Sequence, residues 1–160
     1  MGKPGAFTLI EVLIVVVIIS LASAIVVPHL LEPSSLGTQA AGRAVMADIL
    51  FAQSDAVAHQ KARKVVFDTA NDAYRVTDDV DNTLAANWKG GAQYVVSFAN
   101  DLRFQGVALA NVDFGGTATL EFDDLGAPMS GGNVQVVGAT ATYQITVAPL
   151  TGRVTIQTVP

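Results

Sequence analysis

Few residues of this sequence have the types and spacing that catalysis or metal binding requires. The two histidines are His29 and His59, and Asp55 lies one helical turn before His59. This is too little for a catalytic triad or a zinc site, so we expect surface or packing roles for both histidines. The absence of cysteine excludes disulfides, thiolate metal sites and cysteine nucleophiles. There is also no nucleophile elbow, phosphate-binding glycine loop or zinc-protease helix, so we predict a protein that is not an enzyme and needs no cofactor.

Two other groups of side chains could bind something. Residues 78–82, Asp-Asp-Val-Asp-Asn, supply closely spaced oxygen atoms, which suit a hard cation such as calcium. Their spacing is not that of a regular calcium loop, so we favour a solvated loop and predict no metal site. Trp88, Tyr94 and Phe98 could form an exposed binding patch, but aromatic residues near strands are more often core or loop anchors.

The charge distribution argues against nucleic-acid binding. The formal net charge is -5, and the nine Lys and Arg residues are dispersed except for Lys61, Arg63 and Lys64. A nucleic-acid interface would need a basic stripe on one face. We therefore expect no nucleic-acid partner.

One acidic residue stands in an unusual place near the start of the chain. Residues 7–27 form an apolar run of 21 residues whose only charge is Glu11. As a helix this run would extend about 32 Å, which matches a hydrocarbon core of roughly 30 Å, so it predicts a transmembrane helix. A secretory signal peptide would have an apolar region of only about 7 to 15 residues. Lys3 precedes the run, which favours a cytoplasmic amino terminus and an exported remainder.

Glu11 needs an explanation because an ionised carboxylate inside a membrane is costly. On insertion scales the cost is about 2.5 to 3.5 kcal/mol at a helix centre. Either the carboxyl lies near the interface, hydrated or protonated, or it meets a positive charge supplied by another copy of the same kind of helix.

Residues 6–13, Ala-Phe-Thr-Leu-Ile-Glu-Val-Leu, resemble the type III signal of type IV prepilins and pseudopilins. The resemblance implies that a prepilin peptidase removes residues 1–6 as a leader, cuts between Ala6 and Phe7, and N-methylates Phe7. It also implies that Glu11, fifth in the mature chain, pairs with the terminal amine of a neighbouring subunit. The family usually has glycine directly before the cut, whereas here the small residue Ala6 follows Gly5.

A second helical segment is predicted for residues 28–63. Pro28 is the twenty-second residue counted from Phe7, where pilins commonly carry a helix-loosening proline, and we expect a kink or local melting near residues 24–28. Residues 32–35 could interrupt the helix or restart it. Beyond them the segment is rich in alanine, and an apolar face at helical spacing is expected to lie against a sheet, made of Val45, Ile49, Ala52 and Ala56.

The apolar pattern changes to a period of two in residues 64–160. Strands are predicted at residues 64–68, 73–77, 93–98, 107–114, 119–123, 134–137, 142–147 and 154–157. The first two and the last two read as hairpins, around residues 69–72 and 149–152. Segregated helix and strands indicate an α+β fold, in which the long N-terminal helix covers one face of an antiparallel sheet, as in the pilin family.

Residues 120–128 and 151–154 look like the H-type minor pseudopilins of type II secretion and the related minor pilin group. The resemblance implies a minor pseudopilin of a periplasmic filament, anchored once in the bacterial inner membrane with its C-terminal domain in the periplasm. Its implied partners are other pseudopilins or pilins, prepilin peptidase, the inner-membrane assembly platform and membrane lipid. Two alternatives remain: a minor pilin of a type IV pilus or DNA-uptake system, and a membrane-tethered binding domain or enzyme.

Overall fold

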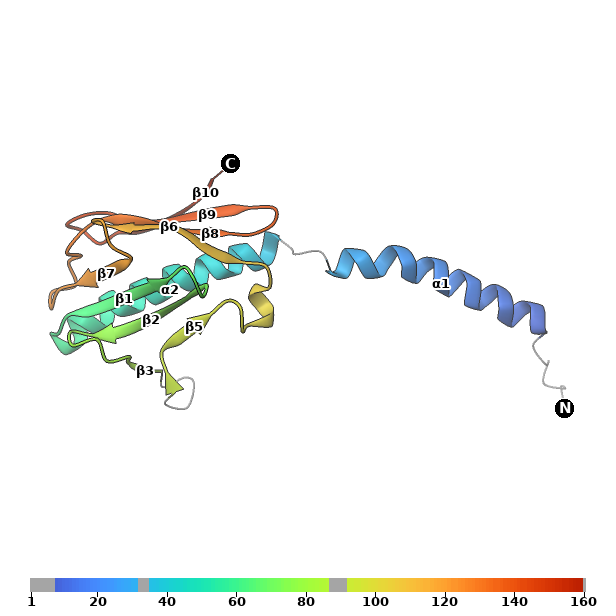
Figure 1. Cartoon of the computed structure of the whole chain (residues 1–160), viewed down its shortest axis with the longest axis horizontal. Helices are drawn as coiled ribbons and strands as arrows, with labels where there is room; N and C mark the ends of the chain where they lie inside the picture. The colour runs from blue at the N-terminus through green and yellow to red at the C-terminus, as the bar shows by residue number, and fades with distance from the viewer. Residues whose placement is uncertain (1–7, 32–34, 87–91, 160) are drawn as a thin grey trace, which may run out of the picture. The chain divides into compact units, whose positions relative to one another are not determined.

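The chain forms two compact units, Met1–Glu32 and Pro33–Pro160. A computed structural model describes residues 8–31, 35–86 and 92–159. In this part the first unit contributes one helix, α1 (Leu9–Leu31), and the second contributes α2 (Ser35–His59) and all the strands (Figure 1).

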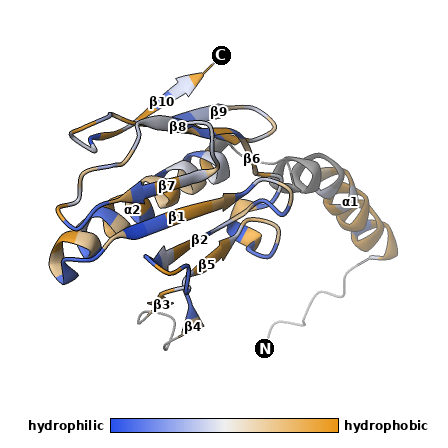
Figure 2. Ribbon diagram, turned by 60° about the vertical axis from the view of Figure 1, so that its left-hand side comes forward, coloured by the Kyte–Doolittle hydropathy of each residue, from blue (hydrophilic) through white to orange (hydrophobic). Residues whose placement is uncertain are grey.

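Residues 9–23 of α1 are apolar except for Glu11, Ser20 and Ser23, and most of this segment has the hydrophobic colour in Figure 2. Its large apolar side chains, from Leu9 to Leu21, are between 48% and 84% exposed. A helix with apolar side chains on every face is normally covered by protein or lipid. Within the described residues, no helix combines the length and apolarity that crossing a membrane requires.

Helix α1 continues through Pro28 and ends at Leu31. The local melting expected near residues 24–28 is therefore not seen, because the backbone there is helical. A proline still removes one backbone donor from the helix, so a bend at Pro28 stays a prediction.

Helix α2 buries a narrow stripe of small and branched side chains. Ala41, Val45, Ile49, Ala52 and Ala56 have no exposed surface. The face predicted from the spacing of the last four is thus confirmed. Alanine allows a close approach of the backbone to the sheets.

The strands form two four-stranded antiparallel sheets instead of the single sheet that we expected (Figure 1). In the first sheet the order is β5 (Val95–Ser97), β2 (Ala73–Asp78), β1 (Arg63–Asp68) and β7 (Thr119–Phe122). In the second sheet it is β10 (Val154–Val159), β9 (Thr142–Val147), β8 (Gly132–Val137) and β6 (Ala108–Phe114). A short pair joins β3 (Ala85–Ala86) to β4 (Ala92–Gln93).

The two sheets separate at the connection between β6 and β7. Gly115 and Gly116 have φ of 68° and 87°, a left-handed conformation that glycine adopts readily. After this turn β7 pairs with β1, whereas β6 pairs with β8. Helix α2 contacts strands of both sheets, so one helix supplies the apolar surface that covers each of them.

The predicted strands agree with the structure except between residues 93 and 98. There the predicted strand is divided into β4 and β5 at Tyr94. The Tyr94 N–H donates to the Leu84 carbonyl, and the Tyr94 carbonyl accepts from the Val76 N–H. The short strand β3 and the 3-10 helix η2 (Leu102–Phe104) were not predicted. Both predicted hairpins are confirmed, by the pairing of β1 with β2 and of β9 with β10.

The core is rich in aromatic side chains. Tyr94 and Phe98 are 4% and 1% exposed, so they anchor the core and do not form a surface patch. Phe98 lies edge-on to Tyr74 and to Phe104, with ring centroids 6.0 and 5.2 Å apart. Trp88, the third aromatic residue singled out in the sequence, lies outside the described residues.

Candidate functional site

The start of α1 is organised by Thr8. The carbonyl of Thr8 accepts from the N–H groups of Glu11 and Val12, at 3.1 and 3.2 Å, and its hydroxyl oxygen lies 3.3 Å from the Glu11 nitrogen. Thr8 is therefore the N-cap, and Glu11 is the third residue of the helix. Thr-x-x-Glu is the sequence signature of a capping box, and this local signal was not among the features predicted from the sequence.

Glu11 is exposed and lies where the helix itself favours a negative charge. The free N–H groups of the first turn give a helix N-terminus a partial positive charge, which stabilises a nearby carboxylate by about 0.3 to 1 kcal/mol. Among the described residues, no side chain or N–H group forms a hydrogen bond or ion pair with the Glu11 carboxylate. The carboxylate is thus positioned but not neutralised within this part of the chain.

The two serines of residues 9–23 have their hydroxyls satisfied within α1. The hydroxyl of Ser20 donates to the Val16 carbonyl at 2.8 Å, and that of Ser23 donates to the Ile19 carbonyl at 2.7 Å. Bonds of this kind let serine occupy an apolar helix without an external partner. Within residues 9–23, Glu11 is therefore the polar side chain that needs a hydrogen-bond or ion-pair partner from outside this segment.

The predicted processing site is not part of the described structure. Gly5, Ala6 and Phe7 lie outside the described residues, and so does the side chain of Pro28. The roles of these residues and the pairing of Glu11 with a terminal amine remain predictions. The geometry instead adds Thr8, which fixes the first turn that carries Glu11.

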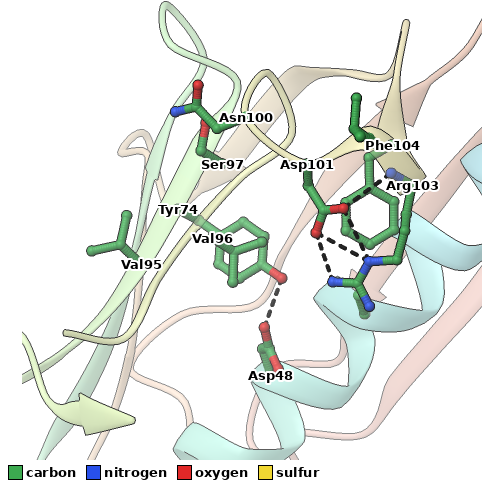
Figure 3. A pocket seen from close by; sticks show the side chains of 11 residues that line it. Asp48, Tyr74, Val95, Val96, Ser97, Asn100, Asp101, Arg103 and Phe104 are labelled. Carbon is green, nitrogen blue, oxygen red and sulfur yellow. Dashed lines mark hydrogen bonds and ion pairs between the residues drawn. The ribbon is translucent and has the colours of Figure 1, made fainter. Parts of the chain in front are cut away.

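A cleft of about 850 Å³ lies between α2, β5 and η2 in the second unit (Figure 3). The hydroxyls of Tyr74 and Tyr94 donate to the two carboxylate oxygens of Asp48, at 2.7 and 2.8 Å. Burial raises the pKa of Tyr74 well above its ordinary value, and the charge of Asp48 adds to this effect. The hydrogen bond between the Tyr74 hydroxyl and the Asp48 carboxylate therefore links α2 to the first sheet. Neither group is arranged for nucleophilic chemistry.

The opposite wall of the cleft also has its charges paired. Arg103 forms an ion pair with Asp101 at 2.6 Å, and its guanidinium lies 5.1 Å from the centre of the Phe104 ring. The contact with Asp101 raises the pKa of Arg103. No nucleophile next to a general base is found among the described residues that line this cleft.

Asp55 has a partner that the sequence did not reveal. Its carboxylate accepts from the Nε of Arg63 at 2.5 Å, and the Arg63 side chain is only 7% exposed. His59 places its Nδ1 3.2 Å from the other oxygen of Asp55 and is 60% exposed, which agrees with the predicted surface role. The side chain of His29 lies outside the described part.

The acidic loop at residues 78–82 is closed by its own hydrogen bonds. Asp78 accepts from the N–H groups of Val80 and Asn82, at 3.1 and 2.8 Å. Asp81 pairs with Lys64 at 2.9 Å. Of the residues that the structure describes, no three His, Cys, Asp or Glu side chains are grouped so that they could hold a metal ion.

Comparisons with known proteins bear on both units. Residues 1–27 match the prokaryotic N-terminal methylation motif. No curated protein matches the chain in sequence. The minor pseudopilin EpsH from the type 2 secretion system of Vibrio cholerae superposes with a TM-score of 0.54 at 10% identity, over 76% of this chain and 96% of EpsH.

A second solved structure has the same architecture. The type IV minor pilin FimU of Pseudomonas aeruginosa strain PAO1 superposes with a TM-score of 0.50 at 15% identity, over 76% of this chain and 87% of FimU. At these identities the likeness establishes the fold. The chain thus has an N-methylation motif of the type IV pilin kind and a pilin-like α+β fold.

Proposed function

We propose that this chain is a minor pseudopilin, a subunit of the periplasmic filament that assists type II secretion. The observation that carries the proposal is an apolar helix inside a segment that matches the N-methylation motif, whose first turn presents the Glu11 carboxylate without a partner among the described residues. The pilin-like second unit, with its similarity to EpsH, supports the same conclusion.

In this proposal prepilin peptidase removes residues 1–6 by cutting between Ala6 and Phe7, and then methylates the amine of Phe7. Residues 7–27 anchor the chain in the inner membrane through their apolar surface, and residues 64–160 complete a periplasmic β domain. The partners are prepilin peptidase, the inner-membrane platform, lipid and the other subunits of the filament. The chain acts through assembly and is not an enzyme.

Assembly requires that Glu11 meet a positive charge. In a low-dielectric surrounding an unpaired carboxylate and an unpaired amine are both costly, and a pair of them is much less so. An incoming subunit whose Glu11 reaches the Phe7 amine of its neighbour is therefore held in one axial position. Thr8 contributes by fixing the first turn, since its cap sets where the Glu11 side chain begins.

The test compares two single substitutions in α1. Glu11→Ala should leave membrane insertion and removal of residues 1–6 unchanged, yet reduce the amount of the chain in isolated filaments at least tenfold. Ser20→Ala, which removes a hydroxyl already satisfied within the helix, should have no effect on either measurement. Normal incorporation of the Glu11→Ala variant would refute the proposed pairing.

Amino-terminal mass spectrometry of the native protein tests the processing step. A chain that begins with methylated Phe7 supports the proposal. Retention of residues 1–6 in the membrane protein would instead favour a tethered binding domain or enzyme.

The similarity to FimU supports a second candidate, a minor pilin of a type IV pilus or DNA-uptake system. Deletion of the chain separates the two. Loss of protein export with normal pili favours the pseudopilin, and loss of pili with normal export favours the minor pilin.

A further inference from the structure

Strand β10 ends the second sheet, and no described strand pairs with its outer edge (Figure 1). It pairs with β9 through all six of its residues, without a register shift. The Ala148 N–H donates to the Arg153 carbonyl at 2.9 Å, which fixes the groups of β10 that face β9. Because the direction alternates along an antiparallel strand, the N–H and C=O groups of Ile156 and Thr158 point away from β9.

These outward backbone groups lie where a partner can reach them. Residues 155–159 are half-buried or exposed. Ile156 packs on α2, since a Cβ at Gly42 would lie only 2.9 Å from the Ile156 Cδ1. Gln157 is exposed, and side chains alternate between the two faces of a strand. A strand added beside β10 would therefore have one face toward α2 and the other toward solvent.

The other edges of the two sheets carry features that prevent pairing. Strand β5 has only three residues. The outer edge of β7 is occupied by the segment that follows it, since the Met129 N–H donates to the Glu121 carbonyl at 2.8 Å. Strand β6 has a register shift between Ala110 and Asp113, and Asp113 adds an exposed charge. Short strands, covering segments, bulges and charges are the means by which proteins block unwanted strand pairing.

Strand β10 has none of these protections. Residues 154–159, Val-Thr-Ile-Gln-Thr-Val, contain no charge and no proline, and five of the six are β-branched. The exposed Arg153 precedes the strand and is not part of it. An open edge of this composition is an aggregation hazard. A regular and uncharged edge of this kind therefore indicates that a partner covers it in the working protein.

We propose that β10 receives an extended segment of another protein, which adds a fifth strand to the second sheet. Such a segment would bond to the backbone of Ile156 and Thr158, and it would carry uncharged side chains, apolar on the side of Ile156 and hydroxyl or amide on the side of Gln157.

A second copy of this chain is the less suitable occupant. Among the described strands of the two four-stranded sheets, β10 has the one unprotected edge, so a copy could offer only its own β10. That contact would be two-fold and would close as a dimer, whereas a filament needs contacts that stay open. The choice of another protein over a copy therefore rests on the proposed filament role.

The first test uses a synthetic peptide with the sequence of residues 142–147, the strand that already pairs with β10. Added to the full chain in detergent, it should slow hydrogen exchange at the amides of Ile156 and Thr158 at least tenfold. Thr158→Pro removes only an outward N–H, which an edge strand tolerates, and should abolish the protection. Thr158→Ala keeps this N–H and should retain the protection. Fast exchange in both the natural chain and the Thr158→Ala variant would overturn strand addition at this edge.

The second test identifies the kind of partner in cells that assemble the filament. A photo-crosslinking amino acid in place of the exposed Gln157 should give an adduct with a different protein. Thr158→Pro should reduce this adduct at least fivefold, and Thr158→Ala should leave it unchanged. The same crosslinker in place of Val80, which is 69% exposed, should not give it. An adduct between two copies of the chain, or none, would overturn the proposal.

Entry into filaments is measured in parallel, by detecting the chain in sheared filament fractions. A chain that is in filaments while its β10 edge gives neither protection nor an adduct refutes strand addition and leaves the proposed function intact. A chain whose β10 edge binds another protein but never enters filaments refutes the proposed function and leaves strand addition intact.

Discussion

Replacing Asp55 by alanine should strongly destabilise the second unit. The Arg63 guanidinium is only 7% exposed, its Nε lies 2.5 Å from Asp55, and one terminal nitrogen donates to the Ala62 carbonyl at 3.0 Å. Removing one partner of a buried ion pair leaves an uncompensated charge, which typically costs about 3 to 5 kcal/mol. A domain of this size has a total stability of roughly 5 to 15 kcal/mol, so the loss is a large part of it.

The assay is urea unfolding of the second unit, residues 33–160, followed by circular dichroism. The midpoint should fall while the slope m stays constant, because the surface exposed on unfolding is nearly unchanged. A thermal scan should show a fall in Tm of the order of 10 °C or more.

A double variant separates the lost pair from lost packing. Asp55→Leu with Arg63→Met replaces both charges with apolar groups of similar size, and such replacements are often neutral or stabilising. The double variant should therefore recover most of the stability that Asp55→Ala loses. A cost of less than about 1 kcal/mol for Asp55→Ala would show that water solvates the guanidinium, and it would refute the buried ion pair as a source of stability.

Three further substitutions test other contacts. Burial raises the pKa of Tyr74, so above about pH 10 the folded state keeps a proton that the unfolded chain releases. The free energy of unfolding should therefore fall above about pH 10, by up to 1.4 kcal/mol per pH unit. Tyr74→Phe should flatten this fall in urea titrations between pH 9 and 11. Gly132→Ala would place a Cβ 2.6 Å from a ring carbon of Phe114 and closer still to the Asp113 carbonyl, so it should cost at least about 1 to 3 kcal/mol and lower the Tm. His59→Ala removes an exposed contact with Asp55 and should change stability by less than about 1 kcal/mol in the same assay.

The local elements were predictable because each depends on nearby residues. The stripe from Val45 to Ala56 follows from helical spacing, and the strands of the last hairpin follow from the alternation of Thr and Gln with Val and Ile. The capped first turn at Thr8 was equally available, since Thr-x-x-Glu is a local signal.

Pairing between segments far apart in the chain was harder to predict from the sequence. Whether β7 joins β6 or β1 depends on how the turn at Gly115 and Gly116 directs the chain, and alternation of side chains gives no information on that choice. Arg63 lies on a strand and Asp55 on a helix, so no single periodicity relates them. Leu125 and Leu150 are in turns, where exposure depends on backbone geometry and not on sequence pattern.

The sharing of α2 by both sheets has a mechanical consequence. A pull on Ser35 along the axis of α2 would load the contacts of the helix with both sheets simultaneously, in shear, instead of opening them one after another. A subunit built in this way should resist tension better than one in which each sheet is covered by its own helix. Force spectroscopy that pulls from residue 35 against anchors in both β1 and β10, one strand of each sheet, would measure this resistance directly.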